Sequence, residues 1–307
     1  MNPDRRPPEA LVSGDVSLPY SKGLMAKTLM GAGIRPERAY ELARLIEGEL
    51  VRSGEDSAIG AERLYDVAAG VLAQHEGEEA VRLLRRLQAL RELDLPIVLL
   101  VGGATGTGKS TVATEVAHRL GITRVTSTDT VRQTMRAFFS QKFMPSIHYS
   151  SFEAGPAVRI HEGEDDDAAL LGFKEQTRNV LVGVKAVIAR ALEEGYSVAV
   201  EGVHLVPGAL PRSYEGAVVV QCMLEIEEED EHARHFWVRD SGSQGLRPME
   251  KYLRSLPEIR RIQAYLVERA ENAGVPVIDN ARIESAVNEV LHLVLAEVER
   301  AQDRARM

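Results

Sequence analysis

The feature that most constrains this chain is a glycine-rich octapeptide at residues 103–110, Gly-Ala-Thr-Gly-Thr-Gly-Lys-Ser. An apolar run at 95–101 precedes it, and a helical pattern at 111–120 follows it. A strand, a glycine-rich turn and a helix in this order are typical of a phosphate-binding loop, in which backbone N–H groups and the positive end of the helix hold an anion. The pattern therefore predicts that the chain binds the phosphates of a nucleoside triphosphate.

The loop also suggests a role for each of its residues. Lys109 would contact the β- and γ-phosphates and assist catalysis, and the hydroxyl of Ser110 would bind Mg²⁺. ATP and Mg²⁺ are the expected cofactors. The alternative is a glycine-rich turn that merely carries a surface lysine. The residues expected to bind the nucleotide are Gly103, Ala104, Thr105, Gly106, Thr107, Gly108, Lys109, Ser110 and Thr111.

Length and composition narrow the classes of protein. The 307 residues suit two domains of about 150 residues each. A net charge of −9 disfavours nonspecific binding of nucleic acid. The only cysteine, Cys222, lies in an apolar run, so we expect a buried strand thiol rather than a nucleophile. The first residues do not resemble a secretory signal, and no apolar stretch reaches the ~20 residues of a membrane span, so we expect a cytoplasmic protein without a membrane partner.

The first part of the chain, residues 1–94, predicts a small and mostly helical domain with a disordered start at 1–12. Apolar residues recur there at intervals of three and four, which is the period of a helix. The pair Leu95-Pro96 marks the boundary with the second domain. The expected helices cover residues 22–30, 36–50, 61–73 and 78–93.

The second part, residues 95–307, alternates short apolar strands with helices. Apolar strands without polar alternation predict an α/β fold, with a parallel sheet covered by helices on both faces. A long helix is expected at 177–194, whereas 139–172 has weak periodicity and its acidic run at 162–167 predicts a solvated loop rather than a metal site. Besides the run before the loop, the expected strands are 125–127, 197–201, 217–225 and 275–279.

Ligands of such sheets bind at the carboxyl ends of the strands, where Asp129 and Arg132 follow the 125–127 strand. Asp129 would accept a hydroxyl proton during catalysis or contact the Mg²⁺ through water. Arg132 would bind a phosphate or carboxylate of the acceptor substrate. This segment resembles the equivalent segment of adenylate-kinase-like enzymes. In the alternative interpretation, Asp129 only caps a helix and Arg132 is a surface residue.

Further candidates lie later in the chain. Glu201 ends the next strand and is expected to act in catalysis near the metal. For His204, a structural role and contact with the substrate are both left open. Arg234 and Arg239 would close over the γ-phosphate as catalytic lid residues, unless they belong to an ordinary charged helix. A basic rim for an anionic substrate could be extended by Arg254, Arg260 and Arg261.

Several segments together resemble the 2-phosphoglycerate kinases, over roughly residues 96–280. The most specific is Glu-Gly-Val-His-Leu-Val-Pro-Gly at 201–208. The resemblance implies a P-loop kinase fold of the adenylate-kinase type and ATP-dependent phosphorylation of the free hydroxyl of 2-phosphoglycerate, giving 2,3-bisphosphoglycerate. His148 would then donate to the same small anionic substrate. The other matching segments are the P-loop, 127–132, 145–151, Gly172-Phe173 with Gln176, and 274–280.

The N-terminal part resembles an ATP-cone, a small helical nucleotide-sensing domain, at 18–24 and 33–39. The resemblance implies a second nucleotide site. ATP-cones usually begin with a basic Lys-Arg-x-Gly strand, and residues 11–16 lack that basic pair. A role in packing or dimerisation, and with it a homo-oligomer, therefore stays open.

The sequence leaves three other functions open. A kinase could act on another small polyol phosphate or an inositol phosphate. A nucleic-acid end kinase would need a basic channel, which the acidic composition disfavours. A non-enzymatic regulator would bind the nucleotide and signal to a partner without turnover.

Overall fold

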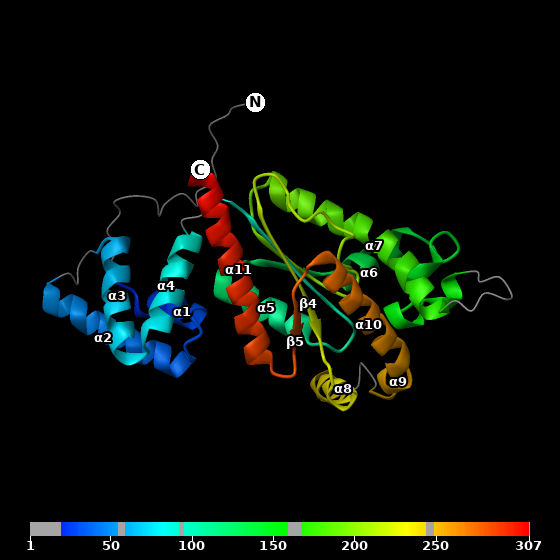
Figure 1. Ribbon diagram of the computed structural model, residues 1–307, viewed down its shortest axis with the longest axis horizontal. Coiled ribbons are helices and arrows are strands. Elements are labelled where there is room, and N and C mark those ends of the chain that lie inside the picture. The colour runs from blue at the N-terminus through cyan, green and yellow to red at the C-terminus, as the bar shows by residue number, and fades with distance from the viewer. Residues whose placement is uncertain (1–19, 55–58, 92–94, 159–166, 244–248, 307) are drawn as a thin grey trace, which may run out of the picture. The chain divides into compact units, whose positions relative to one another are not determined.

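The computed structural model describes residues 20–54, 59–91, 95–158, 167–243 and 249–306 (Figure 1). For residues 91, 237–243, 305 and 306 it describes the backbone alone. The chain forms two compact units, Met1–Leu93 and Asp94–Met307. The disordered start expected at 1–12 lies outside the described residues. None of the described helices is long and apolar enough to cross a membrane.

The first unit is a bundle of helices around its own core. Leu42, Ile46 and Leu50 recur every four residues on one helix and are buried, as the apolar period predicts. Leu29 and Leu84 from other helices pack into the same cluster. The four expected helices are confirmed, and their bounds are α1 Lys22–Gly31, α2 Pro36–Ser53, α3 Ala61–His75 and α4 Glu78–Arg91.

The second unit contains a parallel sheet of five strands in the order β2-β3-β1-β4-β5. Glu201 is in register with Val101 on one neighbouring strand and with Ser127 on the other. The carboxyl ends of β1, β2 and β3 therefore lie level with one another, which is where a ligand is expected. The strands are β1 Ile97–Gly103, β2 Arg124–Ser127, β3 Val198–Glu201, β4 Val218–Glu225 and β5 Val277–Asp279, each overlapping an expected strand.

Helices cover the sheet on both faces, which explains why β1 is buried along its whole length. Val98 and Leu100 pack against Val180 and Val184 of the helix α7. In Figure 1, α7 and α10 lie on one side of the strands, and α5 and α11 lie on the other. The bounds of these helices are α5 Lys109–Leu120, α7 Ala168–Glu193, α10 Leu256–Ala273 and α11 Ile283–Arg306. The α/β fold class is thus confirmed.

The prediction for α7 was wrong at its start, because the helix begins at Ala168 rather than at 177. The weak periodicity of residues 139–172 gave no sign of this longer helix. Gly172 lies inside it, where a Cβ would overlap the carbonyl group of Ala154, so the glycine serves close packing. Asp167, the last residue of the acidic run, caps α7 by accepting a hydrogen bond from the amide of Leu170 at 3.1 Å. Residues 162–166 of that run lie outside the described part.

The remaining elements connect the sheet to the candidate site. Three short 3-10 turns occupy the segment of weak periodicity before α7. Cys222 lies fully buried on β4, as expected, and burial raises the pKa of its thiol to about 12. The connecting elements are α6 Thr128–Phe138, η1 Pro145–His148, η2 Ser151–Glu153, η3 Gly155–Ala157, α8 Glu229–Ser243 and α9 Met249–Arg254.

Candidate functional site

The glycine-rich loop joins the end of β1 to the start of α5, as the motif predicts. Gly106 and Gly108 have φ angles of 90° and 75°, in the region that favours glycine. A Cβ on Gly106 would lie 2.5 Å from Cε1 of Phe236, and one on Gly108 would overlap the amide of Asn280. The loop therefore needs glycine at these two positions, both for its backbone conformation and for its close packing.

The first residues of α5 meet the end of β3. Lys109 is almost buried, and its Nζ donates to the carbonyl of Ala104 at 2.6 Å. Ser110 Oγ donates to Oε1 of Glu201 at 2.9 Å, and Glu201 is buried as well. The expectation that ligand-binding residues gather at the carboxyl ends of the strands, called here the strand-end rule, agrees with this contact between a hydroxyl and a carboxylate that lie 91 residues apart in the chain.

Asp129 and Arg132 form an ion pair one turn into α6, with 3.1 Å between Arg132 Nε and Asp129 Oδ1. The side chain of Asp129 is 65% exposed and that of Arg132 only 14%. Arg132 Nη1 also donates to the carbonyls of Ile147 and Tyr149, at 3.0 and 2.8 Å. Arg132 is therefore no isolated surface residue, since it ties the start of α6 to the turn η1.

Asp129 is not the cap of α6. The cap is Ser127, whose Oγ accepts from the amide of Thr130 at 2.9 Å. Partial desolvation of the Asp129 carboxylate raises its pKa. Its electrostatic interactions with His204, Arg132 and Lys109 outweigh this effect and bring the pKa below its ordinary value. The carboxylate is therefore ionised and in part open to solvent.

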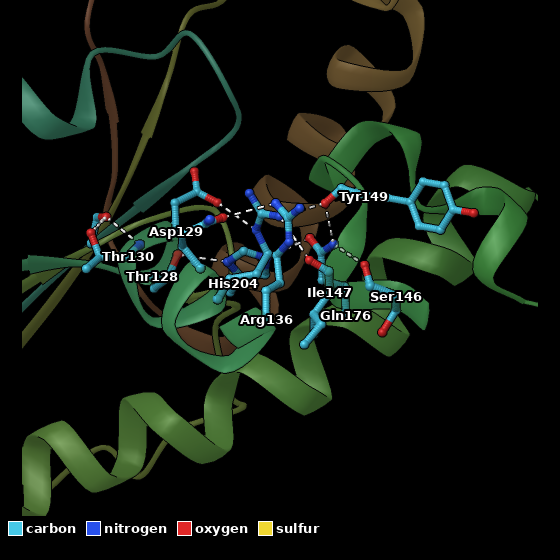
Figure 2. Close-up of polar contacts among 12 residues, drawn as sticks. Thr128, Asp129, Thr130, Arg136, Ser146, Ile147, Tyr149, Gln176 and His204 are labelled. Carbon is cyan, nitrogen blue, oxygen red and sulfur yellow. Dashed lines mark hydrogen bonds and ion pairs between the residues drawn. The ribbon is translucent and has the colours of Figure 1, made fainter. Parts of the chain in front are cut away.

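His204 is fully buried, and both of its ring nitrogens have protein partners (Figure 2). Nε2 lies 2.9 Å from Oε1 of Gln176, and Nδ1 lies 2.8 Å from Oγ1 of Thr128. The Gln176 amide already donates to the carbonyls of Ser146 and Tyr149, so its oxygen accepts and His204 Nε2 carries the proton. Burial lowers the pKa of His204 to about 4, so the ring is neutral at pH 7.

These bonds close a circuit around the start of α6. Thr128 leads to His204, His204 to Gln176, and Gln176 to the carbonyl of Tyr149, which Arg132 also binds. In Figure 2 the side chains of Thr128, His204 and Gln176 follow one another along this path. The segments at 127–132, 145–151, 172–176 and 201–208 therefore meet in one hydrogen-bond network, although they are far apart in the sequence.

The remaining candidates are more loosely connected. His148 lies on η1, where its Nε2 is 2.9 Å from the carbonyl of Phe139. Arg234 lies on α8, is 71% exposed and pairs with Glu231 at 2.6 Å. Arg239 lies on the same helix, so the expected helix-to-loop segment is continuous helix, and its side chain is outside the described part.

The residues proposed to extend a basic rim have protein partners too. Arg254 pairs with Glu250 on the surface, at 3.6 Å. Arg260 donates to the carbonyls of Ile226 and Glu227, and Arg261 pairs with Asp167 at 3.5 Å.

Sequence reasoning missed contacts made to the loop from distant segments. His232 and His235 of α8 and Asn280 after β5 each lie within hydrogen-bonding distance of a loop carbonyl. Asn280 follows β5 directly, at the carboxyl end of a strand, where ligands of such sheets are expected. No sequence signal separated the two histidines from an ordinary charged helix.

The donor set around Ser110 fits a magnesium nucleotide. No group of three or more His, Cys, Asp or Glu side chains among the described residues could hold a metal ion. Mg²⁺ in phosphoryl-transfer sites needs no such group, because it takes one or two protein oxygens and completes its shell with phosphates and water. The Ser110 hydroxyl and the Glu201 carboxylate are oxygen donors of that kind.

A five-stranded parallel sheet that presents a phosphate-binding loop beside Asp129 and Glu201 defines a P-loop kinase. A 2-phosphoglycerate kinase from Thermococcus kodakarensis is 38% identical to this chain over 285 residues, covering 92% of this chain and 95% of its own length. One from Methanopyrus kandleri is 36% identical over 286 residues, covering 92% of this chain and 85% of its own length. The chain belongs to the 2-phosphoglycerate kinase family and is a phosphotransferase.

No family model matches the chain. Among solved structures, a gluconokinase from Sinorhizobium meliloti aligns with a TM-score of 0.36 and 17% identity, over 69% of this chain and 97% of that one.

Proposed function

We propose that this protein transfers the γ-phosphoryl group of ATP to the free hydroxyl of 2-phosphoglycerate, giving 2,3-bisphosphoglycerate and ADP. The observation that carries the proposal is the register of β2 with β3, which brings Asp129 and Glu201 to one edge of the sheet, next to the P-loop. An ionised carboxylate beside the site of phosphoryl transfer suits a hydroxyl acceptor, because it can orient the nucleophile and take its proton. The relatives described above are named 2-phosphoglycerate kinases, which supports 2-phosphoglycerate as the acceptor.

On the donor side, residues 103–111 would bind the triphosphate. Lys109 would leave the carbonyl of Ala104 and place its charge against the β- and γ-phosphates. The site would use Mg²⁺, held by Ser110 with Glu201 and Asp129 nearby, to neutralise charge on the phosphates. Glu201 Oε1 accepts a hydrogen bond from Ser110 Oγ, so it is already positioned to orient that ligand.

On the acceptor side, Asp129 would accept the hydroxyl proton of the substrate. Arg132 would bind the acceptor's phosphate or carboxylate with the edge of its guanidinium that does not face η1. Arg136, one turn further along α6, is exposed and bonds only within the helix to Gln133 among the described residues, so it offers a second cation. His148 would donate to the same anion.

We assign His204 a positioning role in place of direct contact with the substrate. Its full burial and its two bonds, to Thr128 and Gln176, support this assignment. Thr128 precedes Asp129 in the chain, so a fixed Thr128 side chain holds the carboxylate in place.

Arg234 and Arg239 would complete the site from α8 by approaching the γ-phosphate once the substrates are bound. The exposure of Arg234 leaves it able to move, since its pairing with Glu231 is a weak surface ion pair. For the first unit we propose an ATP-cone-like domain over residues 1–94, with the kinase domain at 95–307. Nucleotide binding by the first unit is tested by measuring the equilibrium binding of ATP to the Lys109→Ala variant, in which the P-loop lysine is removed.

The experiment that tests the proposal measures ADP release with 2-phosphoglycerate, 3-phosphoglycerate, small polyol phosphates and inositol phosphates as acceptors. We expect turnover with 2-phosphoglycerate at the highest kcat/KM. Turnover with only an inositol or polyol phosphate would replace the substrate while leaving the kinase assignment intact. Nucleotide binding without any turnover would favour a regulator.

A further inference from the structure

The outward-facing side of the phosphate-binding loop is held by side chains from two distant elements. His232 Nε2 of α8 lies 2.8 Å from the carbonyl oxygen of Thr105. Asn280 Nδ2 donates to the carbonyl oxygen of Thr107 at 2.8 Å. Between them, His235 Nδ1 lies 3.2 Å from the carbonyl oxygen of Gly106. Three consecutive carbonyls of the loop are thus bound from outside it.

These contacts have a direct consequence for the amides of the loop. In a trans peptide the C=O of one residue and the N–H of the next point in opposite directions. A carbonyl of Thr105 fixed toward His232 therefore turns the N–H of Gly106 away from α8, and a carbonyl of Thr107 fixed toward Asn280 turns the N–H of Gly108 away in the same manner. The amide between them, that of Thr107, closes the turn onto Ala104 at 3.4 Å.

The two outer contacts are also the most buried. His232 and Asn280 are both fully buried and packed closely on the loop: a Cβ on Gly108 would lie 2.3 Å from Asn280 Nδ2, and one on Gly106 would lie 3.0 Å from His232 Nε2. A carbonyl oxygen can only accept, so His232 Nε2 carries the proton. Burial lowers the pKa of His232 to about 4, which keeps the ring neutral. His232 stacks on Phe236, with 5.4 Å between the ring centroids, and this fixes its direction.

We propose that His232 and Asn280 are positioning residues for the nucleotide: by holding the carbonyls of Thr105 and Thr107 outward, they aim the amides of Gly106 and Gly108 at the phosphates. The inference rests on the proposed function, because it takes the phosphates of ATP as the ligand of this loop. An anion bound by backbone amides gains most when those amides are already oriented before it arrives. Loss of either contact therefore weakens nucleotide binding without touching the acceptor side.

The test compares variants that remove the donor with variants that keep it. His232→Phe keeps a ring to stack on Phe236 and loses the N–H, whereas His232→Gln loses the ring and keeps an amide donor of similar reach. Asn280→Leu keeps the volume and loses the donor. Gln263→Leu is the matched control, since Gln263 is buried and its amide also donates to a carbonyl, that of Ile226, outside the loop.

ADP is the probe, and its Kd is measured by isothermal titration calorimetry, together with the KM of the acceptor. We expect Kd to rise about tenfold or more in His232→Phe and in Asn280→Leu, the factor that about 1.4 kcal/mol produces. His232→Gln should bind ADP within about threefold of wild type, and Gln263→Leu like wild type. The KM of the acceptor should stay the same in all four variants.

Two results would overturn the inference. One is wild-type affinity for ADP in folded His232→Phe and Asn280→Leu proteins. The other is equal weakening of ADP and acceptor binding, which indicates a general loss of structure. If His232→Phe does not fold, Asn280→Leu supplies the same contrast from the other side of the loop. A wild-type protein that binds no ADP would instead contradict the proposed function itself.

Discussion

His204 and Gln176 are joined by a buried hydrogen bond of 2.9 Å between Nε2 and Oε1, and this bond links the segment after β3 to α7. The Gln176 amide passes the connection on to the carbonyls of Ser146 and Tyr149. Arg132 binds one of these carbonyls from the side of α6. Asp129 and Arg132, which are proposed to contact the acceptor, are therefore held by a network of linked hydrogen bonds.

Lys109→Ala should lower kcat by several orders of magnitude, because it removes a positive charge from the transferring phosphoryl group. The measurement is kcat with saturating ATP and acceptor. Lys174→Ala is a suitable control, since Lys174 lies on α7 over the ring of Tyr265 and not on the loop. Near-normal turnover in Lys109→Ala would refute the donor assignment.

Asp129→Asn should lower kcat by about 10²- to 10⁴-fold and leave the Kd of ATP within about twofold, because the variant loses the proton acceptor but keeps the loop. The pKa of Asp129 lies below its ordinary value of 3.8, so the carboxylate stays ionised from neutral pH down to about pH 5. We therefore expect no acid limb from this group in kcat/KM between pH 7 and 5. An inflection in that window that disappears in Asp129→Asn would contradict the lowered pKa.

Arg132→Ala should raise the KM of the acceptor at least tenfold and leave the KM of ATP nearly unchanged. Arg132→Lys should not restore it, because one ammonium cannot serve a carboxylate and two carbonyls in the planar geometry of a guanidinium. Arg178→Ala is the control, as Arg178 is 78% exposed and pairs with Glu175 on α7. Equal changes in both KM values would mean that the acceptor lies elsewhere.

His204 and His232 should make the folded protein sensitive to acid. Burial lowers the pKa of each ring from 6.5 to about 4, so the unfolded chain binds more protons than the folded chain between these values. The free energy of unfolding should therefore fall as the pH drops through this window, by about 2 kcal/mol for each histidine at pH 5. His204→Gln and His232→Gln should each remove their own share. Urea unfolding at pH 7 and pH 5 measures it, and an undiminished pH effect in the double variant would contradict the assignment.

Much of the fold could be predicted because its signals are local. The strand, loop and helix around residues 103–110 and the apolar strands indicate a parallel sheet, and the strand-end rule then places Asp129 and Glu201 at one edge. The start of α7 could not be predicted, because the apolar periodicity is weak up to Gly172, and the close packing of this glycine on the carbonyl group of Ala154 is known only from the fold.

The contacts within the site were harder to predict than its members. The partners of His232 and Asn280 lie 127 and 173 residues away along the chain, so no local pattern connects them to the loop. His204 left two interpretations open, since a histidine near a strand end has the same sequence appearance whether it binds a ligand or other side chains. Its burial between Thr128 and Gln176 supports the second.

The proposed reaction is tested most directly by identifying its product. The protein is incubated with ATP, Mg²⁺ and 2-phosphoglycerate, and the acceptor is followed by ³¹P nuclear magnetic resonance until ADP release stops. We predict a product with phosphates on the second and third carbons, formed in equal amount to ADP and about 10²- to 10⁴-fold more slowly with Asp129→Asn. ADP release without a new phosphate ester on 2-phosphoglycerate would contradict the proposal.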